Sequence, residues 1–490
     1  MILIIYRSVF GILAVGGLVT IWKSKKWGLF VLGLSLFIQR YNLYFPEINR
    51  SLQLSFIFIP VLLWRWVIWD MTEWISAADI VKLNEREVIK PNSLVNVRRM
   101  VECFLGWIGI VWNRLWQETF FKWLVILWGS SAITFLWAYD KRQAVIELVL
   151  RGLTFGTAFV VYWIGKKDRD SLWYLFGGVI VWLMMDIVLS VFQMRDCILF
   201  GCNHFMHFEH KILGIKGLRL TAQTIKIDGF GRIFRFIGML GDVNMHGFVV
   251  LSVNLLIFGL VGLKHKSYVY YLVLYFLLFC SLCLGLGSLS RSAIVGWLLV
   301  IGYWLFRYCI RCFVSNIRIV DKFIFLCKVF FTVVCFSLPF FVIYIKESTV
   351  NKFVDSFVEA RFNLITEHSA IRHFKVLGEA LEIGVCDVDF RGVGVGSYSS
   401  YYLDMYDSNV VDRGPHSWIG RLFVEEGMIS ICVYISFFVW YLFGVWKNPN
   451  QINLPITVIP LMFISGMMVY YGFFLPMTWV WFGVAEVYLR

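Results

Sequence analysis

The sequence predicts an all-α polytopic membrane protein with 12 to 14 transmembrane helices and a helical external cap. Of its 490 residues, 59% are hydrophobic and 16% are charged, whereas a soluble domain carries about 25% charged residues. The mean hydropathy is +0.73. Continuous apolar stretches such as 323–345 and 454–474 approach the roughly 20 residues that cross a bilayer. Together these features exclude an ordinary soluble domain.

Apolar stretches of spanning length recur along the whole chain, and the first of them is expected to be a retained span rather than a cleaved signal peptide. The Trp-rich stretch 101–116 fits either a span or an interfacial helix. The spans are expected near 2–21, 27–40, 53–69, 121–139, 144–165, 171–193, 247–263, 268–287, 293–308, 323–345, 429–446, 454–472 and 474–488.

Basic residues gather in short connections between these stretches, and the net charge is +13. Such clustering is typical of the cytoplasmic connections of inserted helices, so membrane lipids are expected partners and nucleic acid is not. The basic connections are 23–26, 82–99, 166–169, 264–266 and 307–322.

Two long connections then fall on the external side and divide the chain into five parts. In the second connection, Val350, Phe353, Val354, Phe357 and Val358 recur at helical spacing, which indicates an amphipathic cap helix. The parts are 1–193 with the N-terminal spans, 194–246 as the first external segment, 247–345 with the central spans, 346–415 as the external cap, and 416–490 with the C-terminal spans.

Two stretches next to membrane each carry a conspicuous arginine. In "RFIGMLGDVNMHGF" (235–248), Arg235 precedes Asp242 and Asn244, residue types that cap helices. In "LGLGSLSRSAIVGW" (284–297), Arg291 stands at the tip of a Gly/Ser hairpin, where Ser290 and backbone N–H groups could cradle an anion. Each stretch also has a simpler interpretation. The first would only end and begin helices, with Arg235 extending its charge to the membrane surface, and Arg291 would likewise only extend its charge to the interface.

Two further stretches join the cap to the last spans. In 369–398, Arg372 lies on the cap helix, and "GVGVGSY" (392–398) favours a flexible turn. No strand precedes these glycines, so they do not predict dinucleotide binding. In "RGPHSWIGRLFVEEG" (413–427), His416 begins a helix at the external edge, where imidazole can titrate, and Glu425 follows nine residues later.

The stretch "CNHFMHFEH" (202–210) collects residue types that bind zinc. It lacks ligand pairs at regular intervals, so no metal site is predicted, although one remains an alternative. Cys197 and Cys202 either form a disulfide, which an oxidising side would permit, or stay reduced.

In order and spacing, "RFIGMLGDVN", "SLSRSAIVGW", "AIRHFKVLGEALE…GVGVGSY" and "HSWIGRLFVEEG" resemble the shared core of the O-antigen ligase/polymerase superfamily. The resemblance covers roughly residues 230 to 430. Ser417 stands where the family commonly has Asn, and Val243 stands where a proline often precedes the asparagine.

The resemblance implies a metal-independent glycosyltransferase with a GT-C-like membrane fold and no cofactor. It would move a glycan from undecaprenyl diphosphate to an acceptor sugar at the periplasmic face of the bacterial inner membrane. A ligase uses a lipid A-core acceptor and a polymerase uses another glycan, and these residues do not separate the two.

The resemblance also assigns roles to residues. Arg235, Arg291 and Arg372 would hold the diphosphate, because guanidinium groups bind phosphate oxygens bidentately. His416 would act as the general base on the acceptor hydroxyl. Glu425 would brace the fold; Asn244 and Ser290 would support the site. A rival interpretation is a transporter or flippase of lipid-linked oligosaccharide, although few charges lie mid-span and no internal repeat is visible.

Overall fold

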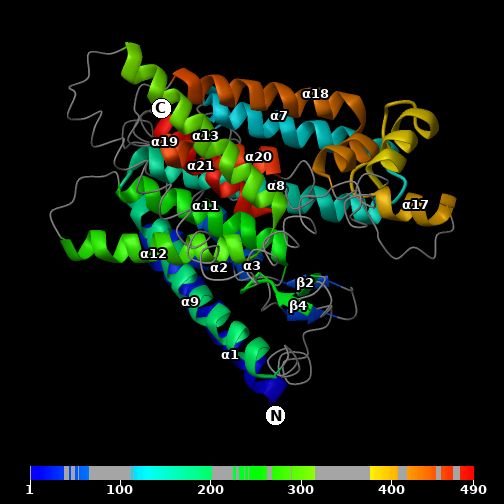
Figure 1. Ribbon diagram of the computed structural model, residues 1–490. Helices are drawn as coiled ribbons and strands as arrows, with labels where there is room; N and C mark the ends of the chain where they lie inside the picture. The colour runs from blue at the N-terminus through cyan, green and yellow to red at the C-terminus, as the bar shows by residue number, and fades with distance from the viewer. Residues whose placement is uncertain are drawn as a thin grey trace, which may run out of the picture.

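A computed structural model shows a predominantly helical protein, which confirms the predicted helical class (Figure 1). It describes residues 2–37, 43–45, 50–52, 54–65, 112–113, 115–200, 224–227, 231–236, 238–240, 242–261, 268–288, 290–314, 376–406, 417–447, 454–466 and 475–489.

Most of the longer described helices follow the predicted apolar stretches closely, although Trp418–Lys447 begins 11 residues before the predicted stretch 429–446. The longer ones are α1 (Ile2–Lys23), α2 (Lys25–Ser35), α3 (Leu54–Arg65), α7 (Thr119–Ile133), α8 (Lys141–Lys167), α9 (Ser171–Phe200), α11 (Val243–Val261), α12 (Tyr268–Gly287), α13 (Arg291–Val314), α18 (Trp418–Lys447) and α21 (Pro476–Leu489). The shorter ones are η3 (Thr134–Trp137), η5 (Ile383–Asp387), α17 (Tyr398–Tyr406), α19 (Leu454–Thr457) and α20 (Ile459–Gly466).

Two short antiparallel strand pairs accompany the helices. Strand β1 (Leu43–Phe45) pairs with β2 (Arg50–Leu52), and β3 (Thr224–Ile227) pairs with β4 (Gly231–Phe234).

Six of the described helices are long and apolar enough to cross a membrane, which makes this a multi-pass membrane protein. The expected total of 12 to 14 spans stays a prediction, because the stretch 323–345 and most of 101–116 lie outside the described residues. The six are Thr119–Trp137, Lys141–Lys167, Ser171–Gln193, Val243–Val261, Tyr268–Gly287 and Trp418–Lys447.

The connections 23–26 and 166–169 meet at one end of the bundle, called here the basic end. Lys26 Nζ lies 2.8 Å from Asp168 Oδ2, and this contact, with the Ser171 hydroxyl, holds the pKa of Asp168 below its usual value. Helix α8 ends there and α9 begins there, so the start of α8 marks the opposite end, called the loop end. The described part of the predicted cap, 376–406, lies at the loop end, where Ser400 Oγ donates to Asp140 Oδ2 (2.8 Å).

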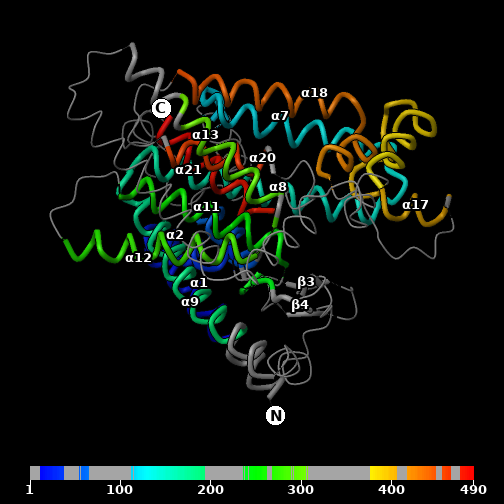
Figure 2. The backbone as a smooth tube through the Cα atoms, in the orientation of Figure 1, coloured from blue at the N-terminus to red at the C-terminus, as the bar shows by residue number. Residues whose placement is uncertain are grey.

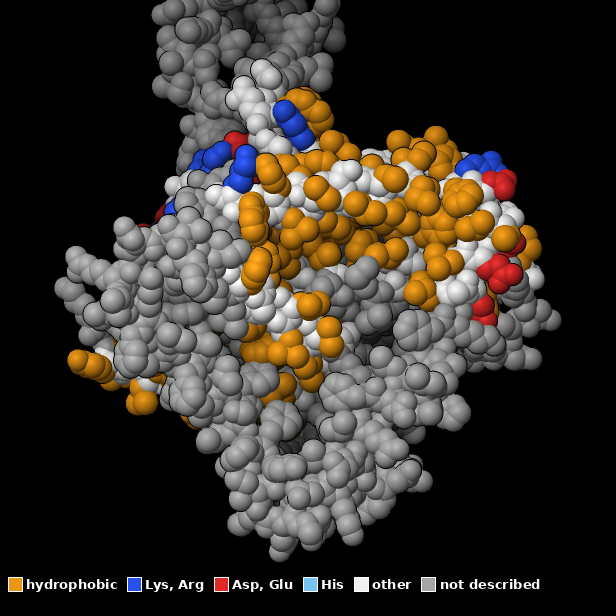
Figure 3. All heavy atoms as spheres, turned by 45° about the horizontal axis from the view of Figure 1, so that its top comes forward, with side chains coloured by type: hydrophobic (Ala, Val, Ile, Leu, Met, Phe, Trp, Pro, Cys, Tyr) orange, Lys and Arg blue, Asp and Glu red, His pale blue; other side chains and the backbone are white. Residues whose placement is uncertain are grey.

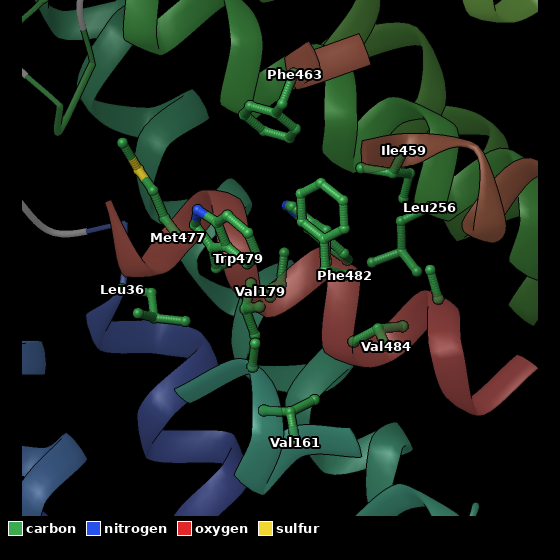
Figure 4. Packing of buried hydrophobic residues seen from close by; sticks show 14 of the residues in the cluster. Leu36, Val161, Val179, Leu256, Ile459, Phe463, Met477, Trp479, Phe482 and Val484 are labelled. Atoms are coloured by element: carbon green, nitrogen blue, oxygen red, sulfur yellow. The ribbon is translucent and has the colours of Figure 1, made fainter. Parts of the chain in front are cut away.

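Helix α21 is the centre of the bundle, and its residues 476–487 are all buried. Figure 4 shows Trp479, Phe482 and Val484 packed among side chains from α2, α8, α9, α11 and α20. Gly483 lies directly against α8: a Cβ there would overlap the Ala158 carbonyl oxygen. The absence of a side chain therefore lets the two helix backbones approach closely.

The lipid-facing surface is clearest on α18, which runs beside α7 (Figure 2). After Gly427 its exposed and buried residues alternate at helical spacing. The exposed ones include Ile429, Ile435, Val439, Leu442 and Trp446, and the buried ones Tyr434, Phe437, Tyr441 and Val445. Figure 3 shows a broad apolar band over the described part of this face. Such a surface suits hydrocarbon rather than water.

The close crossing of α21 and α8 predicts that Gly483→Ala destabilises the protein. The added methyl must push two backbones apart, at a cost of about 1–3 kcal/mol, and the melting temperature in detergent measures it. Gly129→Ala is the matched control, because a Cβ at Gly129 meets nothing within 4 Å. Equal melting temperatures for the two variants would contradict the crossing.

Candidate functional site

The predicted Arg235 stretch packs against the hairpin that leads to Arg291. The described residues 235–236 and 238–240 are called here the arginine loop. Arg235 Nε donates to the Ser288 carbonyl oxygen (2.9 Å), and the Phe236 N–H donates to the Gly287 carbonyl oxygen (3.2 Å). Two motifs distant in sequence therefore converge at the turn between α12 and α13. Arg291 is the first residue of α13, but its side chain is outside the described part.

The hydroxyl groups of Ser288 and Ser290 form hydrogen bonds with backbone groups in and beside this turn. Ser288 Oγ donates to the Gly285 carbonyl oxygen (2.6 Å), and Ser290 Oγ accepts weakly from the Ala293 N–H (3.4 Å). Both serines are fully buried. A Cβ on Gly247 would lie 2.6 Å from Ser288 Oγ, so α11 abuts the turn without space between them. Ser290 thus supports the start of the helix that carries Arg291.

Helix α11 begins beside the arginine loop. Asp242 Oδ1 accepts from the backbone N–H groups of Asn244 and Met245, each at 2.9 Å. Asp242 is therefore the N-cap, as its residue type predicts. Asn244 lies in the first helical turn. Of the two residues expected to cap this helix, only Asp242 does so.

A buried Asp–His pair lies behind the arginine loop. Asp186 Oδ2 and His246 Nε2 are 2.7 Å apart, and both side chains are fully buried. Asp186 Oδ1 accepts from the Met239 N–H (2.7 Å). The sequence interpretation missed both residues. The available signal was a carboxylate within the predicted span 171–193, since an ionisable residue inside a membrane helix needs a partner or a task.

The second convergence joins the glycine loop, residues 392–397, to α18. Gly392, Gly394 and Gly396 all have positive φ angles (+79°, +93° and +72°). The N–H groups of Val393 and Gly394 donate to the carbonyl oxygens of Val424 (2.8 Å) and Glu425 (2.7 Å). The sequence favours a flexible turn here. The structure instead fixes it, because glycines permit direct contact between backbones.

Helix α18 breaks at Gly427, whose φ is +77° and ψ is −172°. The arms 418–426 and 428–447 turn back on each other: the Trp418 ring lies 5.4 Å from the Phe438 ring. The first arm starts at Trp418, with Ser417 Oγ accepting from the Gly420 N–H (3.3 Å). The helix expected to begin at His416 is therefore not one continuous span. Residues 418–426 form a short helix that folds against the spanning arm 428–447.

A buried network of charged groups holds this break in place. Arg151 forms an ion pair with Glu426 and donates to Ser131 Oγ (2.8 Å), which in turn donates to Glu426 Oε2 (2.8 Å). Arg421 Nε donates to Glu425 Oε1 (3.0 Å). Arg151, Glu425 and Glu426 are nearly inaccessible. Glu425 therefore lies between Arg421 and Arg151. Its expected supporting role stays a prediction, and the sequence interpretation missed Arg151 and Glu426.

The glycine loop also contacts the start of α8, where the Asp140 N–H donates to Ser397 Oγ (3.0 Å). Asp140 N-caps α8 by accepting from the Gln143 N–H (3.0 Å), and it accepts from Ser400 on α17 (2.8 Å). These hydrogen bonds hold the pKa of the Asp140 carboxyl below its ordinary value of 3.8.

Several predicted residues lie outside the described residues. They are Arg372, His416, Cys202 and the rest of 202–210, and the Cys197 side chain is not described. In the part that is described, no group of three or more His, Cys, Asp or Glu side chains could hold a metal ion. No family model and no curated protein match the chain in sequence.

The Arg151–Glu426 pair predicts a marked asymmetry between single and double variants. Arg151→Leu leaves a buried carboxylate without its ion-pair partner and should cost roughly 3–5 kcal/mol of stability. Arg151→Leu combined with Glu426→Leu should recover most of this loss, because no buried charge is stranded. Thermal unfolding in detergent measures both. Lys166→Ala removes a half-exposed lysine from its pair with Glu118. It should change little, because Lys166 reaches solvent and Glu118 still accepts from the Tyr162 hydroxyl. A double variant less stable than Arg151→Leu would contradict the pairing.

The Asp140 contacts predict a pH dependence. Because its folded-state pKa is depressed, the stabilising contribution is present above the ordinary value of 3.8 and is lost as pH falls through the lower folded-state value. Asp140→Ala should reduce stability at pH 7 by roughly 0.5–2 kcal/mol. The difference from the natural protein should narrow below about pH 4, measured by thermal unfolding. Asp140→Asn, which cannot titrate, should lose less on acidification; a constant difference would contradict this.

Proposed function

We propose that the protein is a metal-independent glycosyltransferase that moves a glycan from undecaprenyl diphosphate to an acceptor sugar. The observation that carries this proposal is the contact between Arg235 and Ser288, because it brings the first arginine motif to the turn that begins the Arg291 helix. A diphosphate leaving group gains negative charge as the glycosidic bond breaks, and fixed cations aimed at it lower the barrier.

The roles assigned to residues follow from their chemistry. Arg235 is suited to orient toward a phosphate, since the Ser288 carbonyl fixes its Nε–H. Arg291 and Arg372 complete the proposed clamp, and the neutral imidazole of His416 accepts the proton of the acceptor hydroxyl. The arm that follows His416 is held against α8 by Glu425, which lies 3.6 Å from Arg151, and by Arg421, which lies 3.3 Å from Glu147.

We place this chemistry at the periplasmic face of a bacterial inner membrane. The arginine loop and the glycine loop lie away from the basic end, where Lys26 and Asp168 pair, and basic connections mark the cytoplasmic side. The acceptor is either a lipid A-core sugar, as for a ligase, or another glycan, as for a polymerase.

A transporter or flippase of lipid-linked oligosaccharide is the second candidate. Two observations favour it: the break of α18 at Gly427 and the charged network of Arg151, Glu425 and Glu426 inside candidate spans. Transporters use broken helices and intramembrane charges at their substrate sites. Movement of a labelled lipid-linked glycan across proteoliposomes without any acceptor product would select this candidate.

The transfer proposal is tested with purified protein in liposomes, a fluorescent undecaprenyl-diphosphate glycan, and either lipid A-core or a second lipid-linked glycan as acceptor. Product should form in EDTA. Arg291→Lys should lose most activity because a point charge cannot bind phosphate bidentately, and His416→Ala should lose about 10²–10⁴-fold in turnover.

Arg142→Lys is the matched control, because Arg142 is exposed at the start of α8 and has no proposed role. Activity that requires a divalent ion would overturn the metal-independent mechanism. Full activity in Arg291→Lys and His416→Ala would overturn their assignments, and the absence of product with both acceptors would overturn the transferase proposal.

A further inference from the structure

We propose that Asp186 is the positioning residue of the arginine loop: its carboxylate fixes the end of the loop that begins with Arg235. The consequence for catalysis rests on the proposed transferase function, but the structural statement does not.

The Asp186 carboxylate bridges two segments of the chain. Its two oxygens contact partners from two different segments, Met239 in the loop and His246 on α11, each at 2.7 Å. All three residues are buried, and Asp186 and His246 are fully so. A buried carboxylate makes short, charge-assisted hydrogen bonds that are stronger than neutral ones, so this contact is a firm attachment point.

The arginine loop packs against Asp186 and His246 without space between them. Gly238 has a φ of +46°, and a Cβ there would overlap Asp186 Oδ1 and lie 2.6 Å from His246 Nε2. The loop backbone therefore lies directly on the Asp–His pair. Gln193, on the same helix as Asp186, approaches the Gly238 carbonyl at 3.5 Å. Helix α9 thus supports the loop at adjacent points.

The arginine loop is attached at both of its ends, and Arg235 lies at the first of them. The start of the loop is bonded to the α12–α13 turn through Arg235 and Phe236, and its end is bonded to Asp186 through Met239. With only two residues between Phe236 and Met239, the two attachments constrain each other. Loss of the Asp186 attachment should therefore loosen the contact between Phe236 and Gly287 and, with it, the orientation of Arg235.

A disulfide assay tests this without any catalytic readout. Cysteines replace Phe236 and Gly287, whose backbones are hydrogen-bonded at 3.2 Å, and a protease site inserted between α11 and α12 separates the two halves. Phe236→Cys also removes the ring that a Cβ at Gly287 would meet. Membranes are treated with a mild oxidant, and the fraction of cleaved chain that is held together until reduction is measured. Proteins carrying either cysteine alone correct for native cysteines.

The Asp186 variants have distinct expected results in this assay. Asp186→Ala should lower the cross-linked fraction several-fold. Asp186→Asn should retain it, because its Oδ1 can still accept from the Met239 N–H and its amide can donate to a neutral His246. If Asp186→Ala does not accumulate in membranes, Asp186→Glu replaces it; the displaced carboxylate should likewise lower cross-linking. Unchanged cross-linking in the alanine or glutamate variant overturns the proposal.

Asn254→Ala is the matched control for loss of a buried polar contact. Asn254 lies two turns further along α11 and bonds α12 and α13 through Leu278, Ser281 and Trp297. This variant should lower the melting temperature but leave the cross-linked fraction unchanged. An equal fall in cross-linking for Asn254→Ala and Asp186→Ala would show a general structural effect and would also overturn the proposal.

The same variants, without the added cysteines, extend the test to transfer. Asp186→Ala should lower kcat/KM for the lipid-linked donor by about tenfold or more, leave the acceptor KM unchanged, and be rescued by Asn. A change confined to the acceptor KM would overturn the positioning role. Absence of transfer in the natural protein would count against the proposed function alone, since cross-linking still decides whether Asp186 holds the loop.

Discussion

The buried ion pair between Arg151 and Glu426 is the constraint on which the loop-end structure depends. Removing two charges from water costs several kcal/mol per ion unless each retains a well-placed partner. Arg151 belongs to α8, Glu426 to α18, and Ser131, which bonds both, belongs to α7. These three helices therefore cannot slide past one another without exposing a charge to an apolar interior. The break at Gly427 directly follows Glu426, so the pair also fixes where α18 turns.

Backbone hydrogen bonds connect the break in α18 to the glycine loop. The Gly394 N–H donates to the carbonyl oxygen of Glu425, and the Met428 N–H donates to that of Phe390. Because α18 stops being helical at Gly427, these groups lack their usual helical partners, and Gly394 of the glycine loop and the nearby Phe390 supply them. Unpaired backbone groups are especially costly where no water can reach them. The break in α18 therefore depends on the glycine loop, which pairs with backbone groups that the break leaves without helical partners.

The sequence predicts features that depend on neighbouring residues, and it does not predict contacts between residues far apart in the chain. Helix α12 occupies the predicted stretch 268–287 because apolar length alone decides such a span. Hydropathy places the span after Gly427, at 429–446, because Arg421, Glu425 and Glu426 precede it. The reversal itself was missed, since its decisive feature is a positive φ. Asp186 and His246 are 60 positions apart, and no local spacing connects them. By contrast, Asp242 was identified as a cap because capping is local.

Both convergences place a buried acidic residue against a fixed segment of backbone. The Asp186 carboxylate accepts from the Met239 N–H and fixes the arginine loop. Glu425 accepts from the Gly394 N–H through its main-chain carbonyl oxygen, while its carboxylate pairs with Arg421. An arginine on a mobile loop would have to be ordered each time it met an anion, which weakens binding. An arginine on a loop already held by a buried carboxylate needs no such reorganisation, and preorganised charge of this kind is what stabilises a leaving group most effectively. Under the proposed transferase function, Asp186 would therefore contribute without contacting the anion, since it would remove the cost of ordering Arg235.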